Sequence, residues 1–281
     1  MVGAGVGTDH AILPAPTRGA SVAILDKNAR TLHARQYHLH VSPGDVGKYV
    51  LLPGDPARVL MIAEHLEDPR EIAFHREYRT VTGNFRGIEV SGTSTGIGCP
   101  SAAIAVEELA NIGATHFIRV GSSAAYVPEI AQGDLIVNTA TMRLDGTSAA
   151  YVDPRFPAVA DHFLARHLID AARDLAAERG FGVHVGVNAS SDAFYAETPE
   201  FIEELQKHRI SNVEMESSAI FTIAHLRGLC AAMVCAVSYN YMQPDDVDLE
   251  KENHALVAGW DNAIAVALEA IARYEADKNM P

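Results

Sequence analysis

Short apolar segments alternate with longer segments of helical periodicity along most of this 281-residue chain. Strands are expected over residues 49–53, 88–93, 115–120, 134–140, 183–189 and 231–238. Helices are expected over residues 57–66, 100–111, 158–179, 200–208, 217–227 and 252–276. Because this alternation favours neighbouring strands covered by helices on both faces, it predicts an α/β fold. We expect a three-layer α/β/α sandwich around a mixed, mostly parallel central sheet.

The N-terminal segment differs in composition from the rest of the chain. Residues 1–35 contain many Gly, Ala and Thr residues without steady periodicity, and they lack the basic start and long apolar run of a signal peptide. We expect a flexible extension there, with one short strand at residues 20–25. No internal repeat or long low-complexity linker follows, so residues 36–281 are expected to form a single domain.

The charge balance excludes several classes of partner. The chain has 22 Lys and Arg against 36 Asp and Glu, and its net charge of −14 disfavours non-specific binding to nucleic acid or anionic membranes. No run of eighteen apolar residues occurs, so no membrane span is expected. The cysteines, Cys99, Cys230 and Cys235, lack C-x-x-C spacing and are typical of reduced thiols in a cytoplasmic protein; we expect Cys230 and Cys235 to be buried.

Two of the expected strand ends combine a glycine turn with an arginine. Gly54 precedes Arg58 at a helix N-terminus, where backbone N–H groups can approach an anion, although an ordinary capped turn with a surface arginine fits as well. Arg119 lies near the end of an apolar strand, before the expected turn at Gly121 and Ser122. Because a buried arginine needs a partner, this position indicates either an anion site or a buried ion pair.

A third turn carries carboxylates. Met215 is flanked by Glu214 and Glu216, which indicates one carboxylate facing a pocket or acids placed to suit the dipole of the next helix. Arginines at glycine turns bind phosphate-like oxyanions, and a carboxylate can hold a pair of sugar hydroxyls. The chain has no P-loop sequence, so the phosphate of a nucleoside triphosphate is not expected. His38 and His40 have no nearby carboxylate or cysteine group, so they are not expected to bind metal.

A series of short motifs, in order from residue 36 to residue 275, resembles the nucleoside phosphorylase-I family and, within it, the uridine phosphorylase branch. The motifs are Tyr37-His38-Leu39, Pro43-Gly44-Asp45-Val46-Gly47, Leu52-Pro53-Gly54-Asp55-Pro56, His75-Arg76-Glu77-Tyr78, Ser94-Thr95-Gly96-Ile97-Gly98-Cys99-Pro100-Ser101, Glu107-Glu108-Leu109, Ile118-Arg119-Val120-Gly121, Arg143-Leu144-Asp145-Gly146, Phe156-Pro157-Ala158-Val159-Ala160-Asp161, Ser191-Asp192-Ala193-Phe194-Tyr195 and Glu214-Met215-Glu216-Ser217.

The resemblance implies a role for each matching residue. The implied phosphate site is Gly54, Arg58, Arg119 and Ser122, with Arg76 contributed by a neighbouring subunit. The implied ribose site is Met215 and Glu216, with His38 reaching a neighbour's ribose. The implied base contacts are Phe194, Ser123, Tyr239 and Asn240. A monovalent cation, potassium in related enzymes, is implied at Glu77, Ile97 and Ser101 on a dimer interface.

The activity that this resemblance implies is phosphorolysis of a nucleoside to the free base and ribose 1-phosphate. Arg119, Glu216 and His38 are the implied catalytic residues, inorganic phosphate is a co-substrate, and no cofactor is required. Positioning and electrostatics would supply most of the rate, so no covalent nucleophile is needed. The implied assembly is a homo-oligomer whose minimal active unit is a dimer and whose full form is a hexamer.

Three positions depart from the family pattern, and all concern the base. Tyr239 stands where purine-specific relatives carry an Asp, and a tyrosine is a weak acid at neutral pH. The uracil-reading Gln and Arg are absent after Tyr195, and Ala124 stands where the family has a glycine. Uridine or a related pyrimidine nucleoside remains the leading substrate. The alternatives are a purine or broad-specificity phosphorylase, a nucleosidase that uses water, and a non-catalytic nucleoside-binding relative.

Overall fold

The computed structural model describes residues 34–243 and 254–278, so the strand expected at residues 20–25 and nearly all of the expected extension lie outside the described residues. The strands are β1 (Tyr49–Leu52), β2 (Glu67–His75), β3 (Tyr78–Phe85), β4 (Ile88–Thr93), β5 (His116–Ala125), β6 (Leu135–Leu144), β7 (Ala158–Val159), β8 (Val183–Ser191), β9 (Asn212–Glu214) and β10 (Cys230–Asn240). The helices are α2 (Pro56–Glu64), α3 (Cys99–Asn111), α4 (Gly146–Tyr151), α5 (His162–Arg179), α6 (Pro199–Lys207), α7 (Ser217–Leu226) and α8 (His254–Lys278), with a 3₁₀ turn η1 (Phe194–Ala196).

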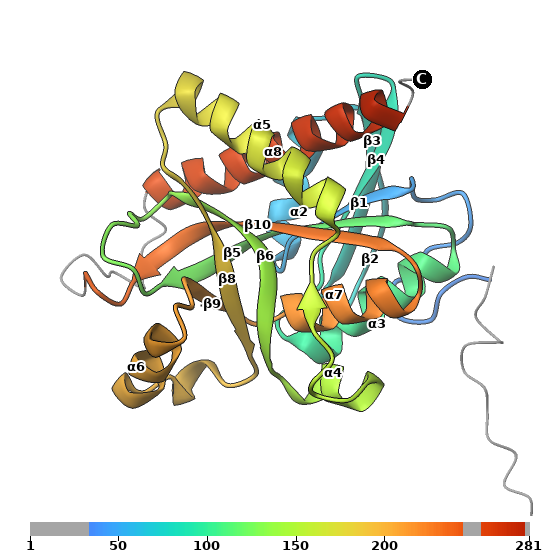
Figure 1. The fold of residues 1–281 in the computed structure, drawn as a ribbon. Helices are drawn as coiled ribbons and strands as arrows, with labels where there is room; N and C mark the ends of the chain where they lie inside the picture. Colours follow the sequence, from blue (N-terminus) through green and yellow to red (C-terminus); the bar gives the residue numbers. More distant parts are fainter. Residues whose placement is uncertain (1–33, 244–253, 279–281) are drawn as a thin grey trace, which may run out of the picture.

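All of these strands belong to one mixed sheet of order β10-β6-β8-β9-β5-β1-β4-β3-β2, most of which are labelled in Figure 1. Strand β7 pairs with β6. Strands β4, β1, β5 and β10 run parallel, and so do β6, β8 and β9. Because β10 also pairs with β5, the strands β10, β6, β8, β9 and β5 close into a ring. This closure brings the ends of β5, β9 and β10 together at one place.

Helices cover both faces of the sheet, which confirms the predicted three-layer arrangement (Figure 1). Helices α3 and α7 pack on one face, where Phe117, Phe221 and Met233 are buried in a common core. Helices α2, α5 and α8 cover the other face, where Ile62, Leu168 and other aliphatic side chains are buried. Burial of each such side chain stabilises the fold by about 1.5–3 kcal/mol, so the two apolar cores hold the sheet rigid beneath the loops.

The C-terminal helix α8 is long and apolar. Over His254–Asp277 it contains a window of mean hydropathy 1.4, which is sufficient by length and composition for a membrane span although the sequence has no run of eighteen apolar residues. Half of that window is buried inside the protein. The helix packs against α5 and β10, with Val266, Leu268 and Ile271 fully buried, so its apolar side chains belong to the core.

Several expected boundaries differ from the structure. The antiparallel pair β2 and β3 was not expected, because β2 is mostly exposed and two irregularities in its pairing with β3 break its alternation. The helix expected from residue 158 begins at His162, since Asp161 caps it and Ala158–Val159 forms β7. Strand β5 continues through Gly121, Ser122 and Ser123, which pair with β10, so these residues form an extended strand and not the expected turn. Cys235 is buried as expected, whereas Cys230 is half-buried.

Candidate active site

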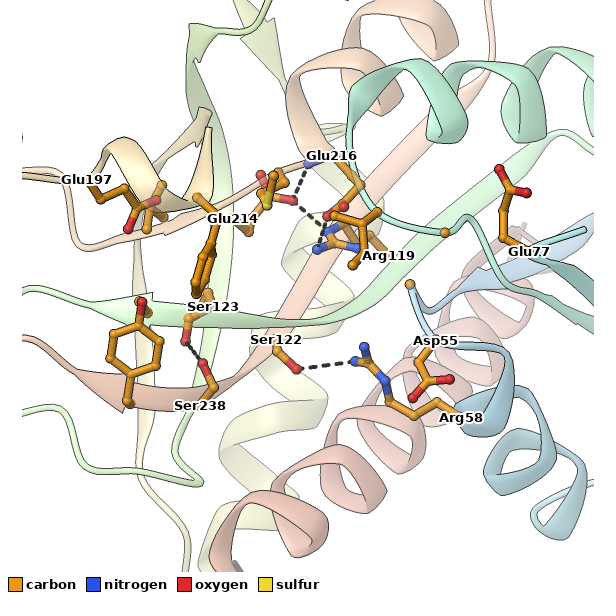
Figure 2. A pocket seen from close by; sticks show the side chains of 18 of the residues that line it. Asp55, Arg58, Glu77, Arg119, Ser122, Ser123, Glu197, Glu214, Glu216 and Ser238 are labelled. Atoms are coloured by element: carbon orange, nitrogen blue, oxygen red, sulfur yellow. Dashed lines mark hydrogen bonds and ion pairs between the residues drawn. The ribbon is translucent and has the colours of Figure 1, made fainter. Parts of the chain in front are cut away.

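A cavity of about 690 Å³ opens at the carboxyl ends of the parallel strands β1, β4, β5 and β10, beside the short antiparallel strand β9. Figure 2 shows the side chains that converge on it. In open α/β sheets this edge is the usual ligand position. The cavity is lined by Gly54, Asp55, Pro56, Arg58, Glu77, Gly96, Ile97, Arg119, Ser122, Ser123, Ala124, Phe194, Glu197, Val213, Glu214, Met215, Glu216, Ser238 and Tyr239.

The turn from β1 into α2 positions the first arginine. The Asp55 carboxylate caps the helix by accepting from the Ala57 backbone N–H at 2.8 Å, and Pro56 occupies the first helical turn. A side chain at Gly54 would approach the Gly96 carbonyl oxygen to 3.3 Å, so the glycine allows the two loops to lie close together. Arg58 is consequently held in the first turn of α2 with its side chain directed at the cavity (Figure 2).

Arg58 is fixed by an aromatic ring and a hydroxyl. Its guanidinium lies 4.9 Å from the centre of the Trp260 ring, and its Nη1 donates to the Ser122 Oγ at 3.2 Å. The Trp260 Nε1 donates to the same oxygen at 2.8 Å. The Arg58 Nε is buried and has no hydrogen-bond partner among the described residues. Arg58 is therefore half-buried and directed into the site, and the surface-arginine alternative is wrong.

Arg119 on β5 is held from two sides. Its side chain is buried, and its Nε donates to the Glu214 Oε2 at 2.7 Å. Its Nη2 pairs with the Glu216 carboxylate, while its buried Nη1 has no partner within the part of the chain that the structure describes. A side chain at Gly121 would lie 2.8 Å from the Arg119 Cζ, so only glycine leaves room for this guanidinium. The buried ion pair, which was one of the two expected alternatives, is therefore present, and the Arg119 Nη1 group remains without a hydrogen-bond partner among the described residues.

The two guanidinium groups influence each other. Burial opposes the charge of Arg119, but Glu216 and Glu214 outweigh it and raise the Arg119 pKa. Burial, and then the like charge of Arg119, lower the Arg58 pKa. Two neighbouring cations that each retain an unpaired N–H group favour an anion between them, because it would satisfy both donors and relieve their repulsion. The geometry therefore suits an oxyanion such as phosphate.

Glu214 and Glu216 have different surroundings. Glu214 accepts hydrogen bonds from the Asn188 side chain and from both the backbone and hydroxyl of Ser217, so it serves to orient Arg119. Glu216 accepts from the Gly98 N–H at 2.6 Å and pairs with Arg119. Burial raises the Glu216 pKa, and although the charge of Arg119 lowers it, the charge of Glu214 adds to the effect of burial. A buried, oriented carboxylate beside an anion site can accept hydrogen bonds from sugar hydroxyls.

The opposite end of the cavity is more aromatic. Phe194 on η1 and Tyr239 on β10 line it, and the Ser123 Oγ is buried without a partner among the described residues. The Ser238 Oγ donates to the Ser123 carbonyl at 3.1 Å (Figure 2). Asn240 departs from expectation. It does not line the cavity, because its side-chain amide donates instead to the backbone carbonyls of Val127 and Ile130 in the loop after β5.

Two other predicted residues lie away from the cavity of their own chain. The His38 Nδ1 is 2.6 Å from the Glu108 Oε1, whose carboxylate also accepts from the His38 backbone N–H. Arg76 is exposed at the turn between β2 and β3, with a φ of 56°. The structure describes one subunit, and the resemblance assigns both residues to a neighbouring one.

The residues predicted for a cation lie at the edge of the cavity. Glu77 and Ile97 line it, whereas Ser101 does not; the Ser101 Oγ donates to the Glu77 Oε1 at 2.8 Å. Burial opposes ionisation of Glu77, but hydrogen bonds from its own backbone and from Ser101 lower its pKa overall. In residues 34–243 and 254–278, no three His, Cys, Asp or Glu side chains gather as a metal-binding group.

Comparison with known proteins agrees with this geometry. A sequence model of the phosphorylase superfamily matches residues 48–273. The chain belongs to this superfamily. It is 44% identical over 262 residues to the uridine phosphorylase of Thermococcus kodakarensis, covering 89% of this chain and 91% of that protein. It is 36% identical to the guanosine phosphorylase of Halorubrum lacusprofundi over 85% of this chain and 98% of that protein.

The fold agrees with the superfamily as well. It is similar to the crystal structure of uridine phosphorylase from Vibrio fischeri, with a TM-score of 0.78, 35% sequence identity and coverage of 85% of this chain and 98% of that one. The superfamily resemblance and the nucleoside phosphorylase fold predicted from the motifs are therefore confirmed.

Three residues of this superfamily member were not singled out from the sequence. Glu214 was expected either to face a pocket or to suit the dipole of the next helix, and its role in orienting Arg119 was not predicted. The sequence predicts Trp260 only as a core residue of α8. Its contact with Arg58 could not be predicted, because it depends on how α8 crosses the sheet. Glu197 lies two residues after the Phe194-Tyr195 pair and lines the cavity, and its carboxylate does not match the Gln and Arg that the family carries in this region.

Proposed function

We propose that this protein cleaves uridine, or a closely related pyrimidine nucleoside, by phosphorolysis to the free base and ribose 1-phosphate. One observation carries the proposal: two guanidinium groups lie in the same site, and each has a nitrogen without a hydrogen-bond partner among the described residues, Arg58 Nε and Arg119 Nη1. The buried Glu216 carboxylate lies beside them. A nucleosidase would need no such anion site. The names of the relatives at 44% and 35% identity support uridine as the substrate.

Phosphate would bind between Arg58 and Arg119. The Arg58 Nε and the Arg119 Nη1 would each donate to a phosphate oxygen, and Ser122 and the backbone at Gly54 would complete the cradle. Arg119 cannot turn away, because Glu214 and Glu216 hold its other two nitrogens. The nucleophile would thus be fixed in place before the glycosidic bond weakens.

Ribose would bind beside Met215 and Glu216. Glu216 would accept hydrogen bonds from the ribose hydroxyls, and its negative charge would stabilise the cationic sugar ring that develops as the bond to the base lengthens. Phosphate would attack C1′ from the side of the arginines while the base leaves toward Phe194, Ser123 and Tyr239. Catalysis of this kind needs positioned charges and no covalent intermediate.

Purine phosphorolysis is the second candidate. The relative from Halorubrum lacusprofundi bears the name guanosine phosphorylase, and the usual uracil-reading Gln and Arg are absent from this chain. Against it, Tyr239 replaces the acid that purine-specific relatives carry, and burial raises its pKa further. Pyrimidine nucleosides therefore remain the preferred substrates in this proposal.

The active assembly would be an oligomer with a dimer as its minimal unit and a hexamer as its full form. Arg76 and His38 would complete the phosphate and ribose sites of a neighbour, since both lie outside the cavity of their own chain. Tyr37 is 67% exposed and Phe74 is 55% exposed, which suits burial between subunits. We assign the reaction to the cytoplasm because Cys99 and Cys235 are buried free thiols.

A monovalent cation such as potassium would bind at Glu77, Ile97 and Ser101. The oxygen atoms of Glu77 and Ser101 lie 2.8 Å apart, and the lowered pKa of Glu77 keeps its carboxylate charged. Hard oxygen donors of this kind suit such an ion. Its role would be to hold the subunit interface, and no chemical step passes through it.

Products and substrate range test the proposal. Purified protein is given uridine, inosine or guanosine at one fixed phosphate concentration, and kcat/KM is measured together with the sugar product. We expect uridine to be preferred and ribose 1-phosphate to form with it. A clear preference for inosine or guanosine would contradict the base assignment, and free ribose as the sugar product would contradict phosphorolysis.

A further inference from the structure

A chain of three hydroxyl and carboxyl groups lies at the end of the cavity far from Arg58. The Tyr239 hydroxyl donates to the Tyr241 hydroxyl at 2.9 Å, and the Tyr241 hydroxyl donates to the Glu197 Oε2 at 2.5 Å. Tyr239 and Glu197 line the cavity, and Tyr241 links them from behind. In Figure 2, Glu197 and Arg58 stand at opposite ends of the cavity. This placement puts the chain beside the base and away from the phosphate.

The surroundings of Glu197 are apolar and uncharged. Ala124, Leu205 and Val213 form the local core against which Tyr239 and Tyr241 pack. The titratable groups that face Glu197 are Tyr239, Tyr241 and Tyr126, and within the described ranges no Lys or Arg lies within ion-pair distance of it. Burial raises the Glu197 pKa, more than the Tyr241 hydrogen bond lowers it. A carboxyl group in such a site holds its proton at higher pH than an exposed one.

We propose that Glu197, acting through Tyr241 and Tyr239, supplies the proton that the departing base takes up. This inference rests on the proposed phosphorolysis and adds a general acid to it. It fills the position left by the absent Gln, Arg and Asp, because the chain of hydroxyls reaches from a protonatable carboxyl group to the base end of the cavity.

The proton transfers balance as follows. When the C1′–N1 bond breaks, its electron pair stays on the base, and a carbonyl oxygen of the base takes the Tyr239 proton. Tyr239 takes the proton of Tyr241, and Tyr241 takes the proton of Glu197, which becomes a carboxylate. In that ionised form both hydroxyls donate toward Glu197, across oxygen–oxygen distances of 2.9 and 2.5 Å that suit transfer in either direction. Solvent then reprotonates Glu197, whose side chain is half-buried.

A relay also explains why tyrosines can take part. Burial raises the pKa of both Tyr239 and Tyr241, so neither can give up a proton and remain a phenolate. In the relay each tyrosine passes on one proton and receives another, so neither acquires a lasting charge. The Tyr126 hydroxyl, which is buried and unpartnered among the described residues, faces the same region and adds a polar neighbour without joining the chain.

The test compares two leaving groups. Glu197→Gln keeps the shape and the hydrogen bond from Tyr241 but cannot supply a proton, and Glu203→Gln on the exposed side of α6 is the matched control. Turnover is measured with uridine and with 5-fluorouridine, whose base leaves more readily as an anion. General acids contribute about 10²–10⁴-fold, so E197Q should lose about 10²-fold on uridine and far less on 5-fluorouridine. E203Q should retain wild-type rates on both.

The pH profile gives a second readout. Wild-type kcat on uridine should fall as the pH rises through the Glu197 pKa, toward the level of E197Q, which should lack this fall. Tyr241→Phe, which interrupts the chain, should show the same loss and should also lack this fall. An equal loss on both nucleosides, or no loss, would overturn the relay while leaving phosphorolysis in place. Absence of wild-type turnover on both nucleosides would contradict the proposed function and the relay with it.

Discussion

The guanidinium of Arg119 and the carboxylate of Glu216 form an ion pair in which both residues are almost inaccessible, at 3% and 4% exposure. Glu214 holds a second nitrogen of the same guanidinium, yet the third is buried and has no partner among the described residues, in a residue that lines the cavity. The pair therefore joins the proposed phosphate site to the proposed ribose site. Any change to it should affect both activity and folding, because each charge is compensated mainly by the other.

Substitution of Arg119 and of Arg58 should separate the effect on activity from the effect on folding. Arg119→Ala should abolish most activity and also lower the free energy of unfolding by about 3–5 kcal/mol, since two buried carboxylates lose their partner. Arg58→Ala should reduce kcat/KM for phosphate by about 10–10²-fold, the value of one charged hydrogen bond, with little change in stability. Denaturant unfolding measures the change in stability, and steady-state kinetics at varied phosphate measures the change in kcat/KM. Arg155→Ala, at an exposed surface pair, is the control. Equal destabilisation by R58A and R119A would be inconsistent with this difference in packing.

Gly121→Ala should disturb Arg119 without touching any ligand directly. The added methyl group would lie 2.8 Å from the Arg119 Cζ, so the guanidinium must shift by several tenths of an ångström. A misplacement of about 1 Å can cost about 10²-fold in rate, so we expect a loss of about 10-fold or more in kcat with the fold retained. Gly146→Ala, where the nearest atom lies at 3.8 Å, should be close to wild type. Wild-type kcat in G121A would show that the position of Arg119 is not critical.

The fall in kcat/KM at low pH should follow the protonation of Glu216. Burial, and then Glu214, raise its pKa, and the proposed role requires the ionised form. Activity should therefore be present above the Glu216 pKa and lost as the pH falls through it, at a pH above the usual carboxyl range. In Glu216→Gln the rate should be about 10²-fold lower and this fall should disappear. Measurement of kcat/KM against pH for both proteins decides the point, and an unchanged fall at low pH in E216Q would assign it to another group.

Complementation should reveal shared sites. Arg76→Ala and Arg119→Ala should each be inactive as homo-oligomers. In a mixed dimer, the cavity of the R76A subunit would receive Arg76 from its R119A neighbour and become complete. Co-refolded or co-expressed variants should then regain part of the wild-type rate, whereas a mixture of R58A and R119A, which damages the same half of the site, should not. No recovery with R76A and R119A would place Arg76 outside the neighbour's site.

Much of the fold follows from local sequence signals, and the misses have physical causes. Apolar strands such as β4 and capped helices such as α2 were predicted to within two residues because burial and capping act locally. Strand β2 was missed because it is stabilised by pairing with β3 and not by an apolar face of its own. Strand β5 was ended too early, since its last residues are extended only because β10 and β9 pair with them.

The site residues also divide into those that local sequence signals indicate and those that depend on contacts between distant parts of the chain. Local signals indicated that Arg119 needs a partner, because it lies in an apolar strand, whereas the choice of Arg58 and Glu216 as site residues depended on the family resemblance. Glu197 could not be predicted, because its importance depends on Tyr241, which lies 44 residues away and meets it only through the closed ring of strands. Asn240 was misassigned for the converse reason: its neighbour Tyr239 faces the cavity, whereas its own side chain faces the Val127 loop.

The most direct test of the central claim is the rate of uracil release from uridine as phosphate is raised from zero, with ribose 1-phosphate counted in parallel. The account predicts no release without phosphate, a saturable rise as the site between Arg58 and Arg119 fills, and one ribose 1-phosphate for each uracil. Release at an equal rate without phosphate, with free ribose as the product, would contradict it.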